Sequence, residues 1–279
     1  MAKCFFVTDL HGRVHLYEKL FNEIVQQKPD AVFFGGDLLP GISSDYDDFL
    51  CDFLFPGLEK IKKTLKNEYP SIFIIMGNDD PRIHEETLKS NENLELYTYI
   101  HNKKAIFKDF AVYGYSFIPP TPFRLKDWER YDVSRYVDPG CYAPAEGVHS
   151  VKPGEDIEYI TIQDHLLKLT QEMVPEKSIF LFHSPPYQTK LDRAALDGMM
   201  VEHVPLDVHV GSIAIKRFIE EKQPLITMHG HIHESSSITG EWKEIIGRTH
   251  MFSAAYDKNK LSLVIFDPHK PENNKRELI

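Results

Sequence analysis

Residues 3–12, Lys-Cys-Phe-Phe-Val-Thr-Asp-Leu-His-Gly, decide the fold of this 279-residue chain. The first half is a short apolar run, typical of a strand buried on both faces. The second half places a carboxylate and an imidazole, Asp9 and His11, where that strand ends. Downstream, Tyr17, Leu20 and Ile24 recur at helical spacing and predict an amphipathic helix over residues 14–27. A buried strand followed at once by such a helix indicates a layered α/β fold.

Other apolar runs end at polar residues in the same way. Four of them are predicted to be strands, at residues 31–34, 71–76, 178–182 and 224–228. They lead to Asp37, Asn78, His183 and the run from His229 to His233. Further strands are expected near 94–97, 104–107, 111–114, 249–253 and 261–266. Further helices are expected over 45–66 in two pieces split at Pro56-Gly57, near Pro81, and over 159–169 and 211–222.

The order of these elements predicts one α/β domain over residues 1–266. Strand and helix alternate in the first third, and the rest is richer in strands, so a sandwich with mixed sheets is expected. Residues 115–156 hold six prolines and many aromatic side chains, which predicts an irregular but ordered excursion near the site. Residues 267–279 are polar and are expected to form a loosely held C-terminal tail.

Composition narrows the classes of function. The formal net charge of −10 disfavours a general electrostatic grip on nucleic acid or on an anionic membrane. The three cysteines, Cys4, Cys51 and Cys141, form no CxxC pair, which argues against a zinc-thiolate site and favours a reducing cytosol. The apolar runs are far shorter than the ~20 residues that cross a bilayer. We therefore expect a cytoplasmic protein without a membrane partner, and we predict no oligomeric state.

The polar residues at the strand ends predict a metal site. Loops at the carboxyl ends of strands in an α/β sheet converge on one crevice. The side chains expected to meet there are Asp9, His11, Asp37, Asn78, His183, His231 and His233. Oxygen and nitrogen ligands without thiolate suit Mn, Fe or Zn. Seven ligands are too many for one tetrahedral ion, but they suit two divalent ions about 3.5–4 Å apart that share a carboxylate.

Each motif alone has a plainer interpretation. Asp9-Leu10-His11 could be a turn or a helix cap, and Gly-Asp and Gly-Asn pairs are usually turns. A lone His183 would more often be a core histidine. The shared position after apolar strands, and the glycines that precede several of these residues, favour the metal site. His229 falls outside the spacing and is interpreted as a strand residue or a partner of a ligand.

The ordered set Asp-x-His, Gly-Asp, Gly-Asn, His and Gly-His-x-His resembles the calcineurin-like metallophosphoesterases. It is carried here by Asp9-Leu10-His11, Gly36-Asp37, Gly77-Asn78, His183 and Gly230-His231-Ile232-His233, and so spans residues 9–233. The resemblance implies a four-layer αββα sandwich with two mixed β-sheets. More locally, Thr121-Pro122-Phe123, Lys126-Asp127-Trp128 and His183-Ser184-Pro185-Pro186 look like a branch of small bacterial-type phosphoesterases.

The resemblance also implies the role of each residue. The first metal would be held by Asp9, His11, Asp37 and His233. The second would be held by Asp37, Asn78, His183 and His231, with Asp37 as the bridge. Catalysis would involve Asp37, Asn78, Asp79 and His183. A water or hydroxide that bridges the metals would attack a small phosphate monoester or diester.

The chain departs from the family at one position. Many members carry Gly-Asn-His-Asp/Glu, and Asp79 stands here in the place of that histidine. A carboxyl group with its ordinary pKa of ~3.9 is a poor acid at pH 7. Three outcomes are open: the pKa of Asp79 is raised, His84 takes the role, or the substrate has a good leaving group.

Both the substrate-binding residues and the type of function can be interpreted in more than one way. In the excursion, Arg124, Lys126 and Trp128 could line a substrate pocket through stacking and phosphate contacts. They could instead anchor the loop or face solvent. The alternatives to a small-molecule esterase are a protein phosphatase and a catalytically silent scaffold with the same fold.

Overall fold

The structure is a computed structural model that describes residues 2–41, 46 and 48–279. Its strands are β1 (Cys4–Val7), β2 (Ala31–Gly35), β3 (Ser71–Ile75), β4 (Thr98–Tyr99), β5 (Lys103–Phe107), β6 (Phe110–Tyr115), β7 (Ser178–Phe182), β8 (Met200–Val201), β9 (Val204–Pro205), β10 (Ile226–His229), β11 (Lys243–Ile246), β12 (Thr249–Ser253), β13 (Ser262–Asp267) and β14 (Lys270–Leu278). Its helices are α1 (Val14–Gln27), α2 (Phe55–Leu65), α3 (Glu85–Ser90), α4 (Ile162–Leu169), α5 (Ile213–Lys222) and α6 (Ser235–Thr239).

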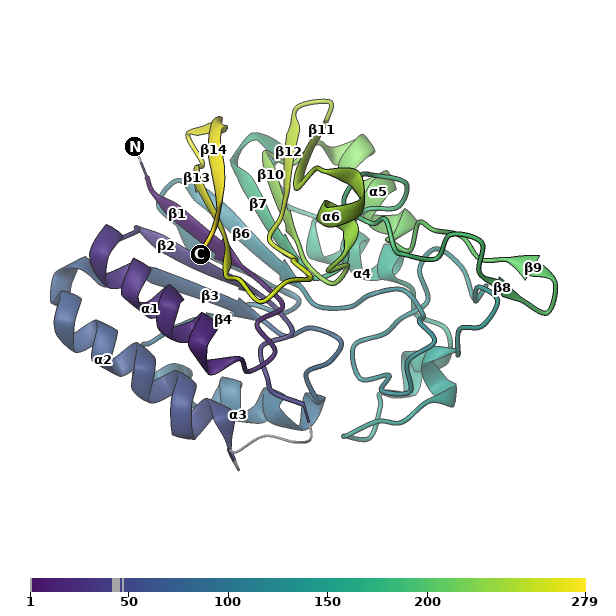
Figure 1. The fold of residues 1–279 in the computed structure, drawn as a ribbon, viewed down its shortest axis with the longest axis horizontal. Helices are drawn as coiled ribbons and strands as arrows, with labels where there is room; N and C mark the ends of the chain where they lie inside the picture. Colours follow the sequence, from purple (N-terminus) through teal and green to yellow (C-terminus); the bar gives the residue numbers. More distant parts are fainter. Residues whose placement is uncertain (1, 42–45, 47) are drawn as a thin grey trace.

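Two six-stranded sheets form the centre of the molecule (Figure 1). Sheet A has the order β14-β13-β1-β2-β3-β4, and sheet B has the order β11-β12-β10-β7-β6-β5. The neighbours β1, β2 and β3 run parallel, as do β6, β7 and β10, whereas the outer pairs β13–β14, β5–β6 and β11–β12 are antiparallel. Both sheets are therefore mixed, as predicted.

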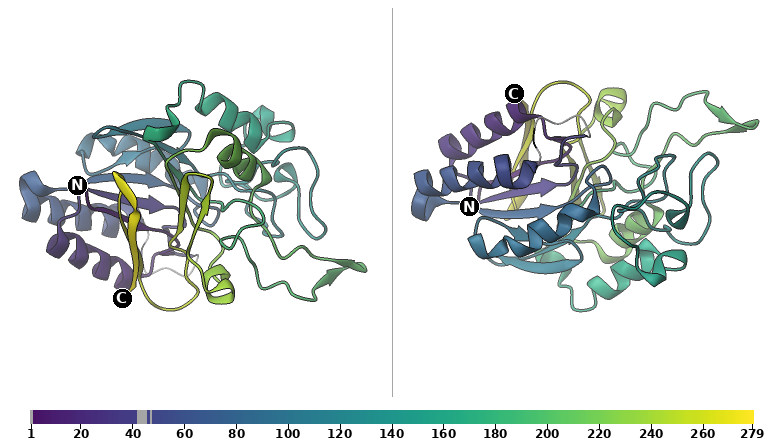
Figure 2. Two further views of the ribbon diagram at one scale, coloured as in Figure 1. Left: turned by 90° about the horizontal axis from the view of Figure 1, so that it is seen from above. Right: turned by 90° about the horizontal axis from the view of Figure 1, so that it is seen from below.

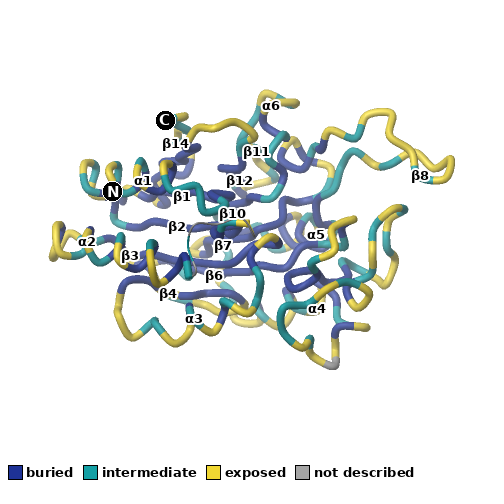
Figure 3. Tube along the Cα trace, turned by 60° about the horizontal axis from the view of Figure 1, so that its bottom comes forward, coloured by how far each residue is buried: buried dark blue, intermediate teal, exposed yellow. Residues whose placement is uncertain are grey.

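The layers follow from the alternation of side chains along each strand. In β1, Cys4 and Phe6 belong to the apolar cluster between the two sheets, whereas Phe5 packs in a second cluster with residues of α1 and α2. In sheet B, Phe180 faces outward and meets Phe218 of α5, with ring centroids 4.9 Å apart. Helices thus cover the outer face of each sheet, and the predicted four-layer αββα sandwich is confirmed. The buried strands of both sheets stand out in Figure 3.

The predicted helices agree with the structure in part. Helix α1 has the predicted bounds, with Leu16, Leu20 and Ile24 buried. In the region predicted as helix from 45 to 66, residues 45 and 47 lie outside the described residues. A π-helical turn, Leu50–Leu54, leads directly into α2, so the predicted break at Pro56-Gly57 is wrong. Pro56 stands where the π-turn passes into α2, one residue after Phe55, whose N–H makes the bond to the Leu50 carbonyl oxygen across that turn.

Two predicted stretches near the strands need correction. Residues 94–97 are not a strand, since a 3₁₀ turn covers Glu92–Leu94 and β4 begins only at Thr98. The polar stretch 267–279 is not a loose tail, because Lys270–Leu278 forms β14, which pairs antiparallel with β13. The polar composition was misleading because an edge strand is held by backbone hydrogen bonds and exposes much of its side-chain surface. The domain boundary predicted at residue 266 is therefore wrong.

Two long irregular segments leave the carboxyl ends of neighbouring strands in sheet B. The first, residues 116–161, follows β6, and the second, residues 183–212, follows β7 and contains the small β8–β9 ribbon. Both extend beyond the sheets on the same side of the molecule (Figures 1 and 2). None of the helices in the described part of the chain has the length and apolar composition to span a membrane.

Candidate metal centre

Five loops at the carboxyl ends of strands bring the predicted ligands together. Asp9 and His11 follow β1, Asp37 follows β2 and Asn78 follows β3, all in sheet A. His183 follows β7, and His231 and His233 follow β10, in sheet B. These residues form two groups that could each hold a metal ion. Within each group, every residue offers one ligand atom, and these atoms all lie within 4.8 Å of one another. The groups are Asp9, His11, Asp37 and His233, and Asp37, His183 and His231.

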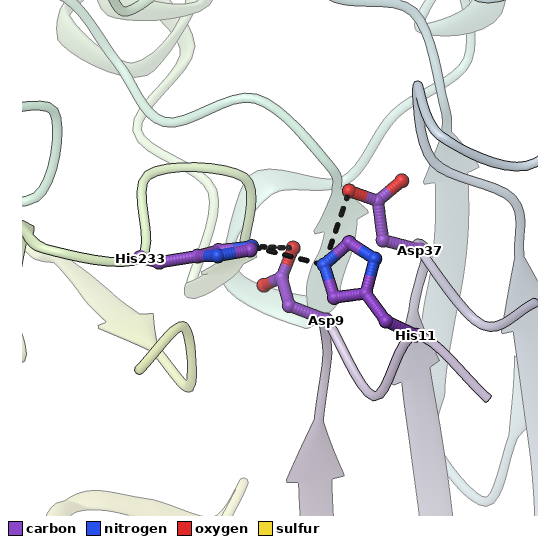
Figure 4. A group of neighbouring side chains, drawn as sticks. All are labelled: Asp9, His11, Asp37 and His233. Atoms are coloured by element: carbon purple, nitrogen blue, oxygen red, sulfur yellow. Dashed lines mark hydrogen bonds and ion pairs between the residues drawn. The ribbon is translucent and has the colours of Figure 1, made fainter. Parts of the chain in front are cut away.

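The first group converges from three loops (Figure 4). The Nε2 atom of His11 lies 3.1 Å from Nε2 of His233 and 3.9 Å from Oδ2 of Asp37. His233 Nε2 also lies 3.3 Å from Oδ1 of Asp9. Two imidazole nitrogens and two carboxylates therefore face one another without a thiolate. This donor set fits Mn, Fe or Zn.

The second group shares one carboxylate with the first. His183 Nε2 lies 3.4 Å from Oδ2 of Asp37, the oxygen that also faces His11, and 2.9 Å from Oδ1 of Asn78. The rings of His183 and His231 are 5.4 Å apart. His183 Nδ1 lies 2.8 Å from the carbonyl oxygen of Gly35, a contact that orients Nε2 toward the cluster. Asn78, which belongs to neither group of acids and histidines, thus lies against the second group through His183.

The backbone at four of these residues is left-handed. Positive φ angles occur at Asp9 (57°), His11 (46°), Asp37 (51°) and His231 (72°). Non-glycine residues seldom adopt this conformation, and where they do it is often at functional sites. With these turns, the side chains of Asp9, His11 and Asp37 leave the ends of their strands and point toward one another (Figure 4).

Two glycines allow the loops to approach one another. Gly36 has a φ of 97°, and a Cβ atom there would lie 2.8 Å from Nδ1 of His183. A Cβ atom on Gly77 would lie 2.3 Å from Oδ1 of Asp37 and 2.6 Å from Cε1 of His183. The first glycine therefore provides a left-handed turn, and the second leaves space for two ligands.

Charges inside the cluster oppose the effect of burial. Burial raises the pKa of Asp37, but the charge and hydrogen bond of His183, together with the charge on His11, hold that pKa below its ordinary value. Burial lowers the pKa of His183 and of His233, but Asp37 raises the first to about 10 and Asp9 raises the second to about 9. Burial, followed by the charge on His183, lowers the pKa of His231 to about 3. The cluster thus holds positive charge between its carboxylates, where a metal ion would sit.

Asp79, the residue in the place of the family histidine, lies at the exposed side of the cluster. Its side chain is 55% exposed, and Oδ2 lies 3.7 Å from Nδ1 of His11. Its backbone N–H donates to Oδ1 of Asp37 at 2.8 Å. Burial and then the Asp37 carboxylate raise its pKa, the first of the three expected outcomes. Among the described residues, no hydrogen bond or ion pair connects His84 with the cluster.

Asp80 is a residue of the centre that the sequence did not reveal. Its side chain is fully buried and accepts hydrogen bonds from the backbone N–H groups of Leu38, Leu39 and Gly77, at 2.9, 2.7 and 2.9 Å. It therefore joins the loop that carries Asp37 to the loop that carries Asn78. Burial, and then Asp37, raise its pKa to about 7. The sequence signal for this role was weak, because Asp80 is simply a second carboxylate between Asp79 and Pro81.

The structure contradicts the predicted substrate contacts of Lys126 and Trp128. Both side chains are fully buried. Lys126 Nζ donates to Oε2 of Glu129 at 2.6 Å, and Trp128 Nε1 donates to the carbonyl oxygen of Asp80 at 2.7 Å. Because their polar groups are already hydrogen-bonded inside the protein, neither side chain is available to a substrate. Arg124 is exposed, with its guanidinium 4.5 Å from the centroid of the Tyr142 ring.

His229 lies outside the metal cluster, as its spacing indicated. It is the last residue of β10 and is fully buried. Nδ1 lies 2.9 Å from the carbonyl oxygen of Ser184, and Nε2 lies 2.8 Å from Oγ1 of Thr227. With both ring nitrogens occupied, it fixes the loop after His183 and is not a ligand.

Comparisons with known proteins bear on the fold and on the family of this chain. One crystal structure has a TM-score of 0.62 at 17% identity, and another, of the protein TT1561 of Thermus thermophilus, has a TM-score of 0.56 at 14% identity. Each match covers 99% of this chain and 98% of the other, and at such identities the likeness shows the fold alone. A search of curated protein sequences gives no match. The profile of the calcineurin-like phosphoesterases matches residues 2–235, and the chain belongs to that family, whose members are generally metal-dependent phosphoester hydrolases.

Proposed function

We propose that this protein is a dinuclear metal-dependent hydrolase of small phosphate monoesters or diesters. The observation that carries the proposal is the position of Asp37. Its Oδ2 atom faces both His11 and His183, at 3.9 and 3.4 Å, so that one carboxylate belongs to both ligand groups. A carboxylate shared in this way is the usual feature of a two-metal site.

Each half of the centre has three ligands of its own and shares Asp37 with the other half. In the proposal, Asp9, His11, Asp37 and His233 hold one cation, and Asp37, Asn78, His183 and His231 hold the other. Mn and Fe suit these donors best, and Zn also suits them. The cations would supply an activated water and positive charge for the phosphoryl oxygens.

Asn78 and Asp79 have further roles in the proposal. Asn78 donates through Nδ2 to Oδ1 of Asp79 at 2.8 Å, which leaves its own Oδ1 directed toward His183. Asp79 reaches the exposed side of the cluster and, with its raised pKa, is the group that we propose as proton donor to the leaving oxygen. The net charge of −10 favours small substrates over nucleic acid polymers.

Hydrolysis of a panel of aryl and alkyl phosphate monoesters and diesters tests the proposal. We expect turnover that requires added Mn²⁺ and is lost after chelation. Asp79→Asn should slow alkyl esters, whose leaving groups need a proton, by roughly 100-fold, but aryl esters much less. The measurement is kcat for each ester with wild type and variant. Failure of all esters under Mn²⁺, Fe²⁺ and Zn²⁺ would favour the silent scaffold, and equal effects on both ester types would exclude the role of Asp79.

Metal affinity should depend on pH in a defined direction. His183 and His233, with pKa values of about 10 and about 9, are protonated at neutral pH, whereas His231, with a pKa of about 3, is already neutral. His233 and His183 belong to different cation sites, so each cation must displace one of these protons, and filling both sites should release about two protons at neutral pH. The affinity for Mn²⁺ should therefore increase as the pH rises from about 6 to about 8. Calorimetry in buffers of different ionisation enthalpy measures both quantities, and a pH-independent Kd would contradict the proposed ligands.

A further inference from the structure

Trp128 and Asp127 hold the backbone on both sides of Pro81. The indole N–H of Trp128 donates to the carbonyl oxygen of Asp80 at 2.7 Å. The carboxylate of Asp127 accepts from the backbone N–H of Arg82 at 2.8 Å, and the Arg82 guanidinium lies 5.2 Å from the centroid of the Trp128 ring. Two consecutive residues of the 116–161 segment thus fix the chain directly after the loop that carries Asn78.

Asp80 transmits this constraint to the metal ligands. Its carboxylate accepts the N–H of Gly77 on one side of Asn78, and the N–H groups of Leu38 and Leu39 directly after Asp37. The N–H of Asp79 donates to Asp37 itself at 2.8 Å. A shift of the Asp80 backbone would therefore move Asn78 and Asp37 relative to each other.

Trp128 is in turn anchored to the other sheet. Its carbonyl oxygen accepts the N–H of Ile118, three residues after β6, at 2.9 Å. Its ring packs edge-on against His101 and at a tilt against Phe117, with centroids 4.9 and 5.6 Å away. Next to it, the buried Lys126–Glu129 ion pair, 2.6 Å between Nζ and Oε2, stiffens the segment. Trp128 therefore connects sheet B with the Asn78 loop of sheet A.

The connection through Trp128 affects the distances between the ligands of the second cation. In the proposed function, the second cation takes Asn78 and Asp37 from sheet A and His183 and His231 from sheet B, so its ligand distances depend on how the two sheet ends are placed. The first cation takes three of its four ligands from sheet A. The tie between the sheets at that site is a different one, in which the His231 backbone N–H donates to the Asp9 carboxylate at 3.1 Å, and it does not involve Trp128. We propose that Trp128 is a positioning residue for the second cation site, an inference that rests on the proposed function.

The test compares Trp128→Phe with Trp242→Phe in the full chain. Phenylalanine keeps an aromatic ring in the core but removes the N–H, which leaves the buried Asp80 carbonyl without this donor. Trp242 packs against Phe252 and Arg276, on β12 and β14, and serves as the matched control. We expect wild type and Trp242→Phe to bind two Mn²⁺ ions. Trp128→Phe should weaken the second site, which alone contains Asn78, by about 10–100-fold, and should weaken the first site, which shares only Asp37 with it, much less.

Calorimetric Mn²⁺ titration gives both dissociation constants, and electron paramagnetic resonance shows whether the two ions are spin-coupled. If wild type binds fewer than two ions, the proposed function fails. If wild type binds two and Trp128→Phe binds both with unchanged Kd, or weakens both equally, only the positioning role is wrong. If Trp128→Phe does not fold, Asp127→Asn, which loses one acceptor oxygen next to Arg82 N–H, decides the question by the same measurement.

Discussion

Asp37→Asn is expected to lower the kcat/KM for phosphate esters by more than about 100-fold, because it removes a proposed ligand of both cations. Loss of a residue that only hydrogen-bonds to a metal ligand typically costs ~10–100-fold. Oδ1 of Asp37 accepts the N–H of Asp79, whereas Oδ2 faces His11 and His183. In asparagine, the carbonyl oxygen would keep the bond to Asp79, and the amide nitrogen would take the place of Oδ2. A nitrogen that carries two hydrogens cannot bind a cation.

Three measurements separate this effect from unfolding. Circular dichroism should show a folded variant, metal analysis should show fewer than two ions per chain, and steady-state kinetics should show the loss of activity. Asp109→Asn is a suitable control, since Asp109 lies in the turn between β5 and β6, at the amino end of β6 and away from the strand ends that carry the ligands. A folded Asp37→Asn variant with wild-type activity would show that Asp37 is not a bridge.

Gly77→Ala is expected to reduce activity by a comparable amount through sterics alone. The added Cβ would lie 2.3 Å from Oδ1 of Asp37, 2.4 Å from its backbone nitrogen and 2.6 Å from Cε1 of His183. The backbone of Gly77 is not left-handed, so alanine would not have to adopt a positive φ there. The clash falls on two proposed ligands of the second cation, and overpacking of this kind costs about 1–3 kcal/mol of stability.

Gly41→Ala is the matched control for this substitution. Among the residues that the structure describes, no heavy atom lies within 4 Å of a Cβ atom on Gly41, although Gly41 lies only shortly after Asp37. We expect Gly77→Ala to lower the Tm by several degrees, at roughly 2–4 °C per kcal/mol, and to lose Mn²⁺ from the second site, while Gly41→Ala changes neither. Thermal melts and calorimetric titration measure the two effects. Normal binding of both ions by Gly77→Ala would mean that the loops can separate without harm.

The main sheets and the ligand set could be predicted because their signals are local. The apolar runs at residues 3–8 and 178–182 are long enough to identify buried strands, and each ends at a residue of metal-ligating type. β14 was missed because an edge strand needs no apolar pattern; its backbone hydrogen bonds to β13 hold it. Trp128 was misassigned because a loop sequence does not show whether an aromatic ring faces a pocket or the core.

The sequence by itself determined which residues follow the strands and in what order, because residue type and periodicity are properties of neighbouring positions. Only the tertiary structure decided that one oxygen of Asp37 faces both His11 and His183, and that Asp80 and Trp128 connect the loops around it. These distances join segments far apart in the chain, such as Asp80 and Trp128, 48 residues from each other. They depend on how two sheets pack, which no local pattern specifies.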